Sequence, residues 1–99
     1  MTKIDQHEKM CKDLHELYII KNKAYGDSFG ETYEKLGIIS AVTRITDKYN
    51  RLVNLATHDI DSGDESIRDT LIDLANYSLM TAMEIDNKIA NYSLMTVTE

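Results

Sequence analysis

The stretch RITDKYNR, residues 44–51, decides how the rest of the chain is interpreted. Its polar members recur at spacings of three and four, so on an α-helix they share one stripe. They are Arg44, Asp47, Lys48 and Arg51. A second stripe with the same spacings is apolar, and it comprises Ile38, Val42, Ile45, Tyr49, Leu52 and Ala56. The pattern predicts an amphipathic helix over residues 38–57, with its apolar stripe in the core and its charged stripe on another face.

An acidic stripe follows about twenty residues later and predicts another helix. Glu65, Asp69, Asp73 and Asn76 recur at spacings of three and four. The helix is predicted to begin at Asp64, since carboxylates in a first turn suit the helix dipole. It would extend to the last residues of the chain. Its apolar residues fall on more than one side, which predicts homo-oligomerisation with two-fold symmetry.

Composition favours one mostly helical domain spanning residues 1–99. The 99 residues include no proline and four glycines, and these are the poorest helix formers. The predicted fold class is all-α: an oligomeric small helical bundle with three main helices and a long C-terminal helix. A single cysteine, a polar start and the lack of a long apolar run favour a cytoplasmic protein without a membrane partner.

The formal net charge of −6 makes general binding of DNA or RNA backbones unfavourable. A small anionic ligand is still compatible with the sequence, because it needs only a local cluster of cations.

The first part of the chain predicts a helix from Thr2 to about Asn22, followed by a loop-rich segment. Thr2 is a suitable N-cap, and Cys11 is expected to be buried on the apolar stripe. In residues 21–37, Asp27 or Ser28 would cap a short helix that ends before Gly37.

Residues 21–29 combine cations and aromatic rings around flexible backbone. Such loops suit a phosphate and a base, which makes Lys21, Lys23, Tyr25 and Phe29 candidate binding residues. The alternative is a connector whose aromatic rings cover the core.

The two charged stripes allow a further pair of interpretations. Carboxylates on neighbouring helices can hold Mg²⁺ for phosphate chemistry, and the candidates are Asp47, Glu65, Asp69 and Asp73. Arg44, Lys48 and Arg51 could bind phosphate groups. Alternatively, an acidic face simply pairs with a basic face in water, where each pair contributes about 0–1 kcal/mol.

The sequence ANYSLMT occurs twice, at residues 75–81 and 90–96. The shift of fifteen residues rotates the second copy by about 60° on a helix, so the two copies cannot present the same face to one partner. Residues 90–99 are therefore predicted to be a dispensable duplicated tail.

Three blocks, at residues 21–28, 44–52 and 65–77, resemble the nucleotide modification associated domain 1 family. This small helical family is common in phages and prophages, and the resemblance covers about residues 15–85. It implies a nucleotide ligand.

In outline the family is similar to all-α nucleoside triphosphate pyrophosphohydrolases of the MazG type. Those enzymes hold Mg²⁺ with Glu-x-x-Glu on one helix and Glu-x-x-Asp on a later one. Here Glu31 and Glu34 stand for the first pair, whereas Glu65 and Asp69 are four residues apart. These departures favour binding over catalysis.

The sequence therefore supports three hypotheses. The first is a non-catalytic binder that needs no cofactor and sequesters a nucleotide, for example a phage protein acting against an immune signal of its host. The second is an Mg²⁺-dependent pyrophosphohydrolase. The third is a structural or protein-interaction oligomer. In the first, the nucleotide would contact Lys21, Lys23, Tyr25, Phe29, Arg44, Lys48 and Arg51.

Overall fold

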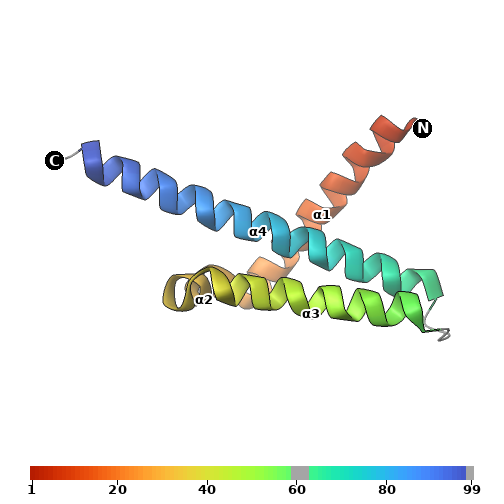
Figure 1. The fold of residues 1–99 in the computed structure, drawn as a ribbon. Helices are drawn as coiled ribbons and strands as arrows, with labels where there is room; N and C mark the ends of the chain where they lie inside the picture. Colours follow the sequence, from red (N-terminus) through yellow and green to blue (C-terminus); the bar gives the residue numbers. More distant parts are fainter. Residues whose placement is uncertain (59–62, 98–99) are drawn as a thin grey trace.

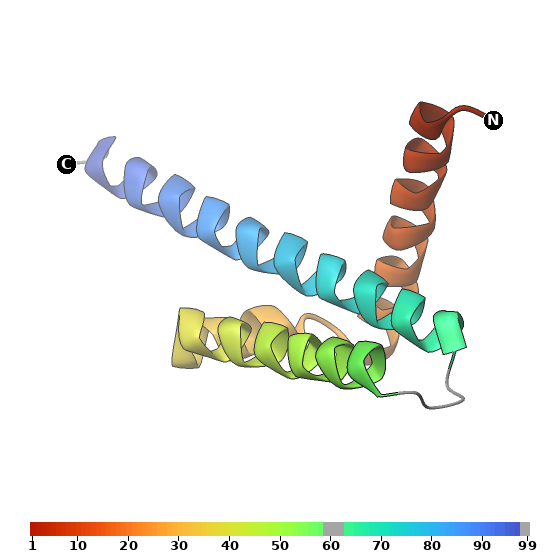
Figure 2. The same cartoon turned by 45° about the vertical axis from the view of Figure 1, so that its right-hand side comes forward.

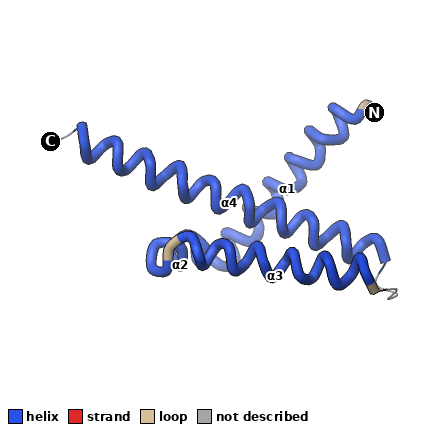
Figure 3. The backbone as a smooth tube through the Cα atoms, in the orientation of Figure 1, coloured by secondary structure: helices blue, strands red, loops and turns tan. Residues whose placement is uncertain are grey.

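The computed structural model describes residues 1–58 and 63–97, and in these residues it contains four α-helices and no strand (Figures 1 and 3). The helices are α1 (Lys3–Tyr25), α2 (Ser28–Leu36), α3 (Ile38–Thr57) and α4 (Gly63–Val97). The all-α class is confirmed. The long central and C-terminal helices lie where they were predicted. The sequence also indicates a turn at residues 58–63 between them, and most of that segment lies outside the described residues.

The start of α1 is fixed by the cap predicted from the sequence. The backbone N–H of Asp5 donates to the Thr2 hydroxyl, and the Thr2 backbone N–H donates to the Asp5 carboxylate, each at 3.1 Å. The Thr2 backbone, and then its side chain, hold the pKa of Asp5 below its ordinary value of 3.8. This interaction therefore contributes to stability above that value, and its contribution is lost as the pH falls through the lowered pKa.

Two glycines end the first two helices and turn the chain. Gly26 has φ 65° and follows α1, and Gly37 has φ 76° and separates α2 from α3. Side chains are strained at positive φ, so glycine is the residue that suits both corners. The segment predicted as loop-rich is thus mainly helical, with two tight turns around the nine residues of α2.

Helices α3 and α4 form an antiparallel hairpin, and α1 and α2 lie on one side of it (Figure 2). The beginning of α1 and the end of α4 project in different directions (Figure 1), and the molecule measures 58 × 33 × 24 Å. No helix in the described part of the chain is long and apolar enough to cross a membrane.

The buried residues between the helices are small or polar. Among the described residues, Ala41 is the buried hydrophobic residue, and Thr70, Asn76 and Thr81 are the buried polar ones. The hydroxyls of Thr70 and Thr81 donate to backbone oxygens one turn earlier in α4, at 2.7 and 2.6 Å. A single chain therefore encloses little apolar volume.

The orientation of α3 differs from the sequence prediction. Its apolar stripe was expected to form the core, but Ile38, Val42 and Tyr49 are 46%, 44% and 56% exposed. Ile45 and Leu52 of the same stripe are half-buried, and Ala41 beside them is buried. Of the charged stripe, Lys48 is half-buried and pairs with Asp73, whereas Arg44, Asp47 and Arg51 are exposed. The covered side of α3 therefore lies at the border of the two stripes, and only part of the predicted apolar stripe is covered in one chain.

Helix α1 also contradicts an expectation of burial. It contains no buried residue, and Cys11 is exposed. Ile4 is 81% exposed because the first half of α1 projects away from the hairpin (Figure 1). The apolar residues of α1 that reach its neighbours lie further along, at Leu14, Leu17 and Tyr18, which are half-buried.

Deleting residues 90–99 is expected to leave the fold and any ligand binding nearly unchanged. Residues 90–97 belong to the projecting end of α4 (Figure 1), and Ala90 and Asn91 are exposed. Circular dichroism, gel filtration and ligand titration of the shortened chain test this. Insolubility, a changed oligomeric state or lost binding would contradict the prediction.

Candidate functional site

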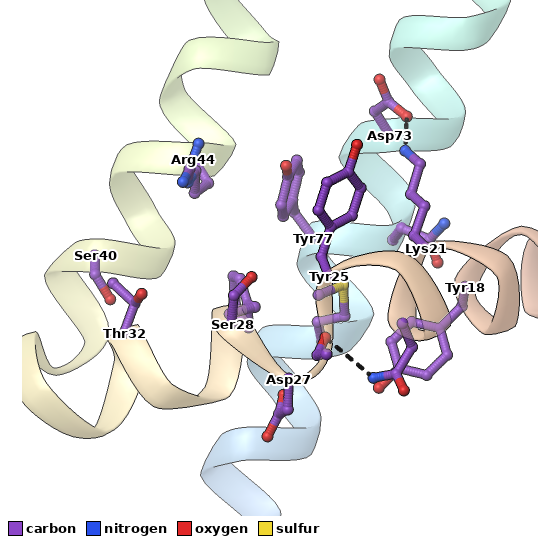
Figure 4. A pocket seen from close by; sticks show the side chains of 15 residues that line it. Tyr18, Lys21, Tyr25, Asp27, Ser28, Thr32, Ser40, Arg44, Asp73 and Tyr77 are labelled. Atoms are coloured by element: carbon purple, nitrogen blue, oxygen red, sulfur yellow. Dashed lines mark hydrogen bonds and ion pairs between the residues drawn. The ribbon is translucent and has the colours of Figure 1, made fainter.

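A cavity of about 230 Å³ lies where all four helices meet. Four of the residues predicted to bind a nucleotide line it, namely Lys21, Tyr25, Phe29 and Arg44. Figure 4 shows that Arg44 on α3 faces Lys21 and Asp73 across the rings of Tyr25 and Tyr77. Residues from the α1–α2 corner and from two long helices are thus brought to one place.

The cations around this cavity differ in their pairing. The Asp73 carboxylate is 3.5 Å from Lys21 Nζ and 3.2 Å from Lys48 Nζ, so one acid is shared by two lysines. The exposed Arg44 makes no ion pair or hydrogen bond with another described residue. Arg44 is therefore a cation that is available to an incoming anion, and the shared acid leaves a formal surplus of one positive charge on the lysines.

Aromatic rings form the apolar part of the lining. The ring centroids of Phe29 and Tyr77 are 6.0 Å apart at a tilt of 35°, within the range of favourable aromatic pairs. Tyr18 and Tyr25 also line the cavity, and Tyr25 is 74% exposed. An exposed ring beside a cation is suited to stacking on a planar ligand.

The beginning of α2 fixes the position of Phe29. The Asp27 carboxylate accepts a hydrogen bond from the Gly30 N–H at 3.2 Å, which caps the helix. A side chain at Gly30 would collide with that carboxylate. Asp27 lines the cavity, but this bond engages it in the cap and orients the first turn of α2.

Three predicted binding residues do not line the cavity. Lys23 is exposed on α1, Lys48 lies beside the cavity and pairs with Asp73, and Arg51 donates its Nε–H to the Thr70 hydroxyl at 3.2 Å. Lys48 can still act on the cavity through Asp73. Arg51 has a structural partner instead.

The predicted metal ligands are not gathered. Asp47, Glu65 and Asp69 are exposed, and of the four predicted carboxylates only Asp73 lines the first cavity. Across the described residues, no three acidic, histidine or cysteine side chains form a group that could hold a metal ion. The assignment of these four carboxylates to Mg²⁺ stays a prediction.

A second cavity, of about 500 Å³, lies between α1 and the first half of α4. It shares Asp73 with the first cavity and also contains Asp13, Asp69 and Arg68. Three carboxylates and one guanidinium make it acidic, so a phosphate group is disfavoured there. The two cavities therefore differ in the charge that they attract.

The sequence pattern did not indicate several of the lining residues. They include Tyr18, Asn22, Thr32, Ser40, Tyr77 and Met80. Tyr77 directly follows Asn76 of the acidic stripe, so an aromatic residue adjoining a polar stripe was the available signal. The hydroxyls of Thr32 and Ser40 had no such signal, because nothing local distinguishes them from other helix surface residues.

The cavity coincides with the region that comparison with known families identifies. The family model described as Nucleotide modification associated domain 1 matches residues 21–85, which is more than half of the chain. The protein belongs to this family. The matched segment contains every residue that lines the first cavity except Tyr18. Searches among curated proteins and solved structures found no match.

Proposed function

We propose that this member of the nucleotide modification associated domain 1 family binds a phosphorylated nucleotide in the first cavity and does not cleave it. The observation that carries the proposal is the guanidinium of Arg44, which has no partner among the described residues and lies in a cavity with four aromatic rings. A guanidinium binds phosphate oxygens with two parallel hydrogen bonds. The aromatic rings would hold the base.

The size of the cavity supports partial enclosure of such a ligand. Its volume of about 230 Å³ is below the roughly 300–1,000 Å³ of typical small-molecule sites. A base and its sugar would occupy it, while part of the phosphate chain would extend into solvent beside Lys21. Lys48 would influence the bound phosphate through its ion pair with Asp73.

The biological role that we propose is sequestration. A binder without catalysis can withhold a nucleotide from a receptor, and in a phage this would counter a nucleotide signal of host immunity in the host cytoplasm. We also propose that the binding form is a homo-oligomer, because exposed apolar side chains occur on all four helices.

The alternative enzyme is an Mg²⁺-dependent pyrophosphohydrolase. It is favoured by Asp73, a carboxylate that lies beside the proposed phosphate position. It would require other acidic side chains to approach Asp73 when metal and ligand bind. The third hypothesis, a structural or protein-interaction oligomer, does not require the cavity to bind a ligand.

One experiment separates the three. The protein is incubated with a panel of nucleotides and Mg²⁺, and the free solution and the denatured protein are analysed by mass spectrometry. An intact nucleotide released only on denaturation is the expected result. A cleaved product would favour the enzyme, and neither result would favour the structural oligomer. In the same experiment Lys23→Ala, which removes a nearby cation outside the cavity, should retain the nucleotide as the parent protein does.

A further inference from the structure

The side of α3 that faces away from the cavity is apolar and uncovered. Ile38, Val42, Tyr49 and Val53 are between 40% and 56% exposed, and their spacings of four, seven and four place them on one stripe. Val42 precedes Arg44 by two residues, which is roughly 200° around a helix. Because Arg44 lines the cavity, this stripe lies on the opposite side of α3.

Helix α4 repeats this arrangement. Leu71, Ile85 and Ile89 are 47%, 36% and 59% exposed, and they share a stripe. Leu71 precedes Asp73 by two residues, so it also faces roughly 200° away from a cavity residue. The uncovered stripes of α3 and α4 therefore lie on the same side of the hairpin.

The arrangement of the helices agrees with this conclusion. In Figure 1, α1 and α2 pass behind the α3–α4 hairpin, and no described helix lies in front of it. We call this front surface the hairpin face, defined by Ile38, Val42, Tyr49, Val53, Leu71, Ile85 and Ile89. The face is long, because it extends over both helices.

The α3 half of the hairpin face carries no charge. All four charged residues of α3 belong to the stripe on the other side of that helix, at Arg44, Asp47, Lys48 and Arg51. The α4 half is bordered by one exposed cation, Arg68, and one exposed anion, Asp86, so the face has no net charge to repel an identical face. Two-fold symmetry places identical surfaces opposite each other, so this property favours a second copy of the chain.

The accessible area of the chain indicates how much surface a partner could cover. It is 7915 Å², whereas a compact monomer of 11.3 kDa exposes about 5,700 Å². The excess is about 2,200 Å² in one chain. Stable interfaces bury about 1,200–2,000 Å² counted over both partners, and obligate homodimers bury more. The excess, which includes the projecting ends of α1 and α4, is of the size that a stable dimer buries.

We infer that the hairpin face binds the hairpin face of a second copy about a two-fold axis. The two hairpins then form a four-helix bundle whose core is the apolar stripes of α3 and α4. The cavities lie on the outer sides of this bundle, where nucleotide can reach them. Arg44 of the charged stripe serves the cavity, and the apolar stripe serves the dimer.

Light scattering coupled to gel filtration, without nucleotide, tests the assignment independently of the proposed nucleotide binding. The parent protein is expected at twice the chain mass of 11.3 kDa or a higher even multiple. Val42→Glu places two carboxylates in the apolar interface and should raise the dissociation constant on the order of 100-fold. The matched control is Ile4→Glu, an exposed isoleucine of α1 outside the hairpin face, which should leave the mass unchanged.

Helical content is measured in parallel by circular dichroism. If Val42→Glu loses its helices, the nearly isosteric Val42→Thr should keep them and still weaken the dimer. A parent protein that is monomeric at micromolar concentration would overturn the inference, as would a dimer broken by Ile4→Glu but not by Val42→Glu or Val42→Thr. So would a monomer that binds phosphatidylcholine vesicles through Val42, since the occupant would then be a lipid surface.

Discussion

Arg44→Ala is expected to weaken nucleotide binding about ten-fold or more. The guanidinium lines the cavity and has no partner in the described part of the chain, so its hydrogen bonds are available to a phosphate. A charge-assisted hydrogen bond contributes on the order of 1.5–3 kcal/mol, and 1.4 kcal/mol corresponds to a factor of ten. Calorimetric titration with the nucleotide retained from the panel measures the effect.

Arg51→Ala is the matched control on the same stripe of α3. Its Nε–H bonds to the Thr70 hydroxyl at 3.2 Å, so its loss should lower the free energy of unfolding by about 1 kcal/mol and leave affinity unchanged. An unchanged affinity in Arg44→Ala would refute the site. If both variants lose affinity equally, the phosphate contacts Arg51 as well as Arg44, which is the arrangement that the charge pattern alone predicts.

Asp73→Asn is expected to tighten nucleotide binding roughly ten-fold. In the free protein the Asp73 carboxylate forms ion pairs with Lys21 at 3.5 Å and with Lys48 at 3.2 Å. Two unit charges 4 Å apart interact by about 1 kcal/mol in water and about 4 kcal/mol near a protein surface. Removing the carboxylate frees Lys21 and Lys48 for phosphate and removes a repelling charge from the cavity. The lost ion pairs should cost about 0–1 kcal/mol each in stability.

The same substitution distinguishes the binder from the enzyme. If Asp73 held Mg²⁺ for hydrolysis, Asp73→Asn would abolish product formation, and binding measured with Mg²⁺ would weaken instead of tighten. The matched control is Asp86→Asn, which removes an exposed carboxylate from the same helix at a position that lines neither cavity. Weaker binding of nucleotide to Asp73→Asn in the absence of metal would contradict the proposed role of the two lysines.

The sequence predicted the local structure well because local signals control it. Thr2 forms a capping box with Asp5. Gly37 directly precedes α3, and its backbone has a positive φ, which favours glycine. The spacing of the charged residues on α3 correctly placed them on one face. Each of these features depends on residues within about one turn of each other.

The candidate site could be predicted only in part. Lys21, Tyr25 and Phe29 were recognised because cations and aromatic rings are concentrated near the α1–α2 corner. Tyr77 and Asp73 join them from a helix more than forty residues away, and no local pattern specifies that meeting. The contact of Lys21 with Asp73 spans 52 residues, so it exists only once the helices have packed.

The sequence by itself determined that this chain forms amphipathic helices and which residues share each stripe, because helical periodicity fixes the relation between neighbours on one helix. The tertiary structure decided which part of each stripe is covered. On α3 the covered side lies at the border of the two stripes, where Ala41 is buried and Ile45, Lys48 and Leu52 are half-buried. Periodicity cannot make that choice, because it does not specify how a helix is rotated against its neighbour. Here Lys48 and Arg51 find polar partners on α4, and the part of the apolar stripe with Ile38, Val42 and Tyr49 is left exposed in the single chain.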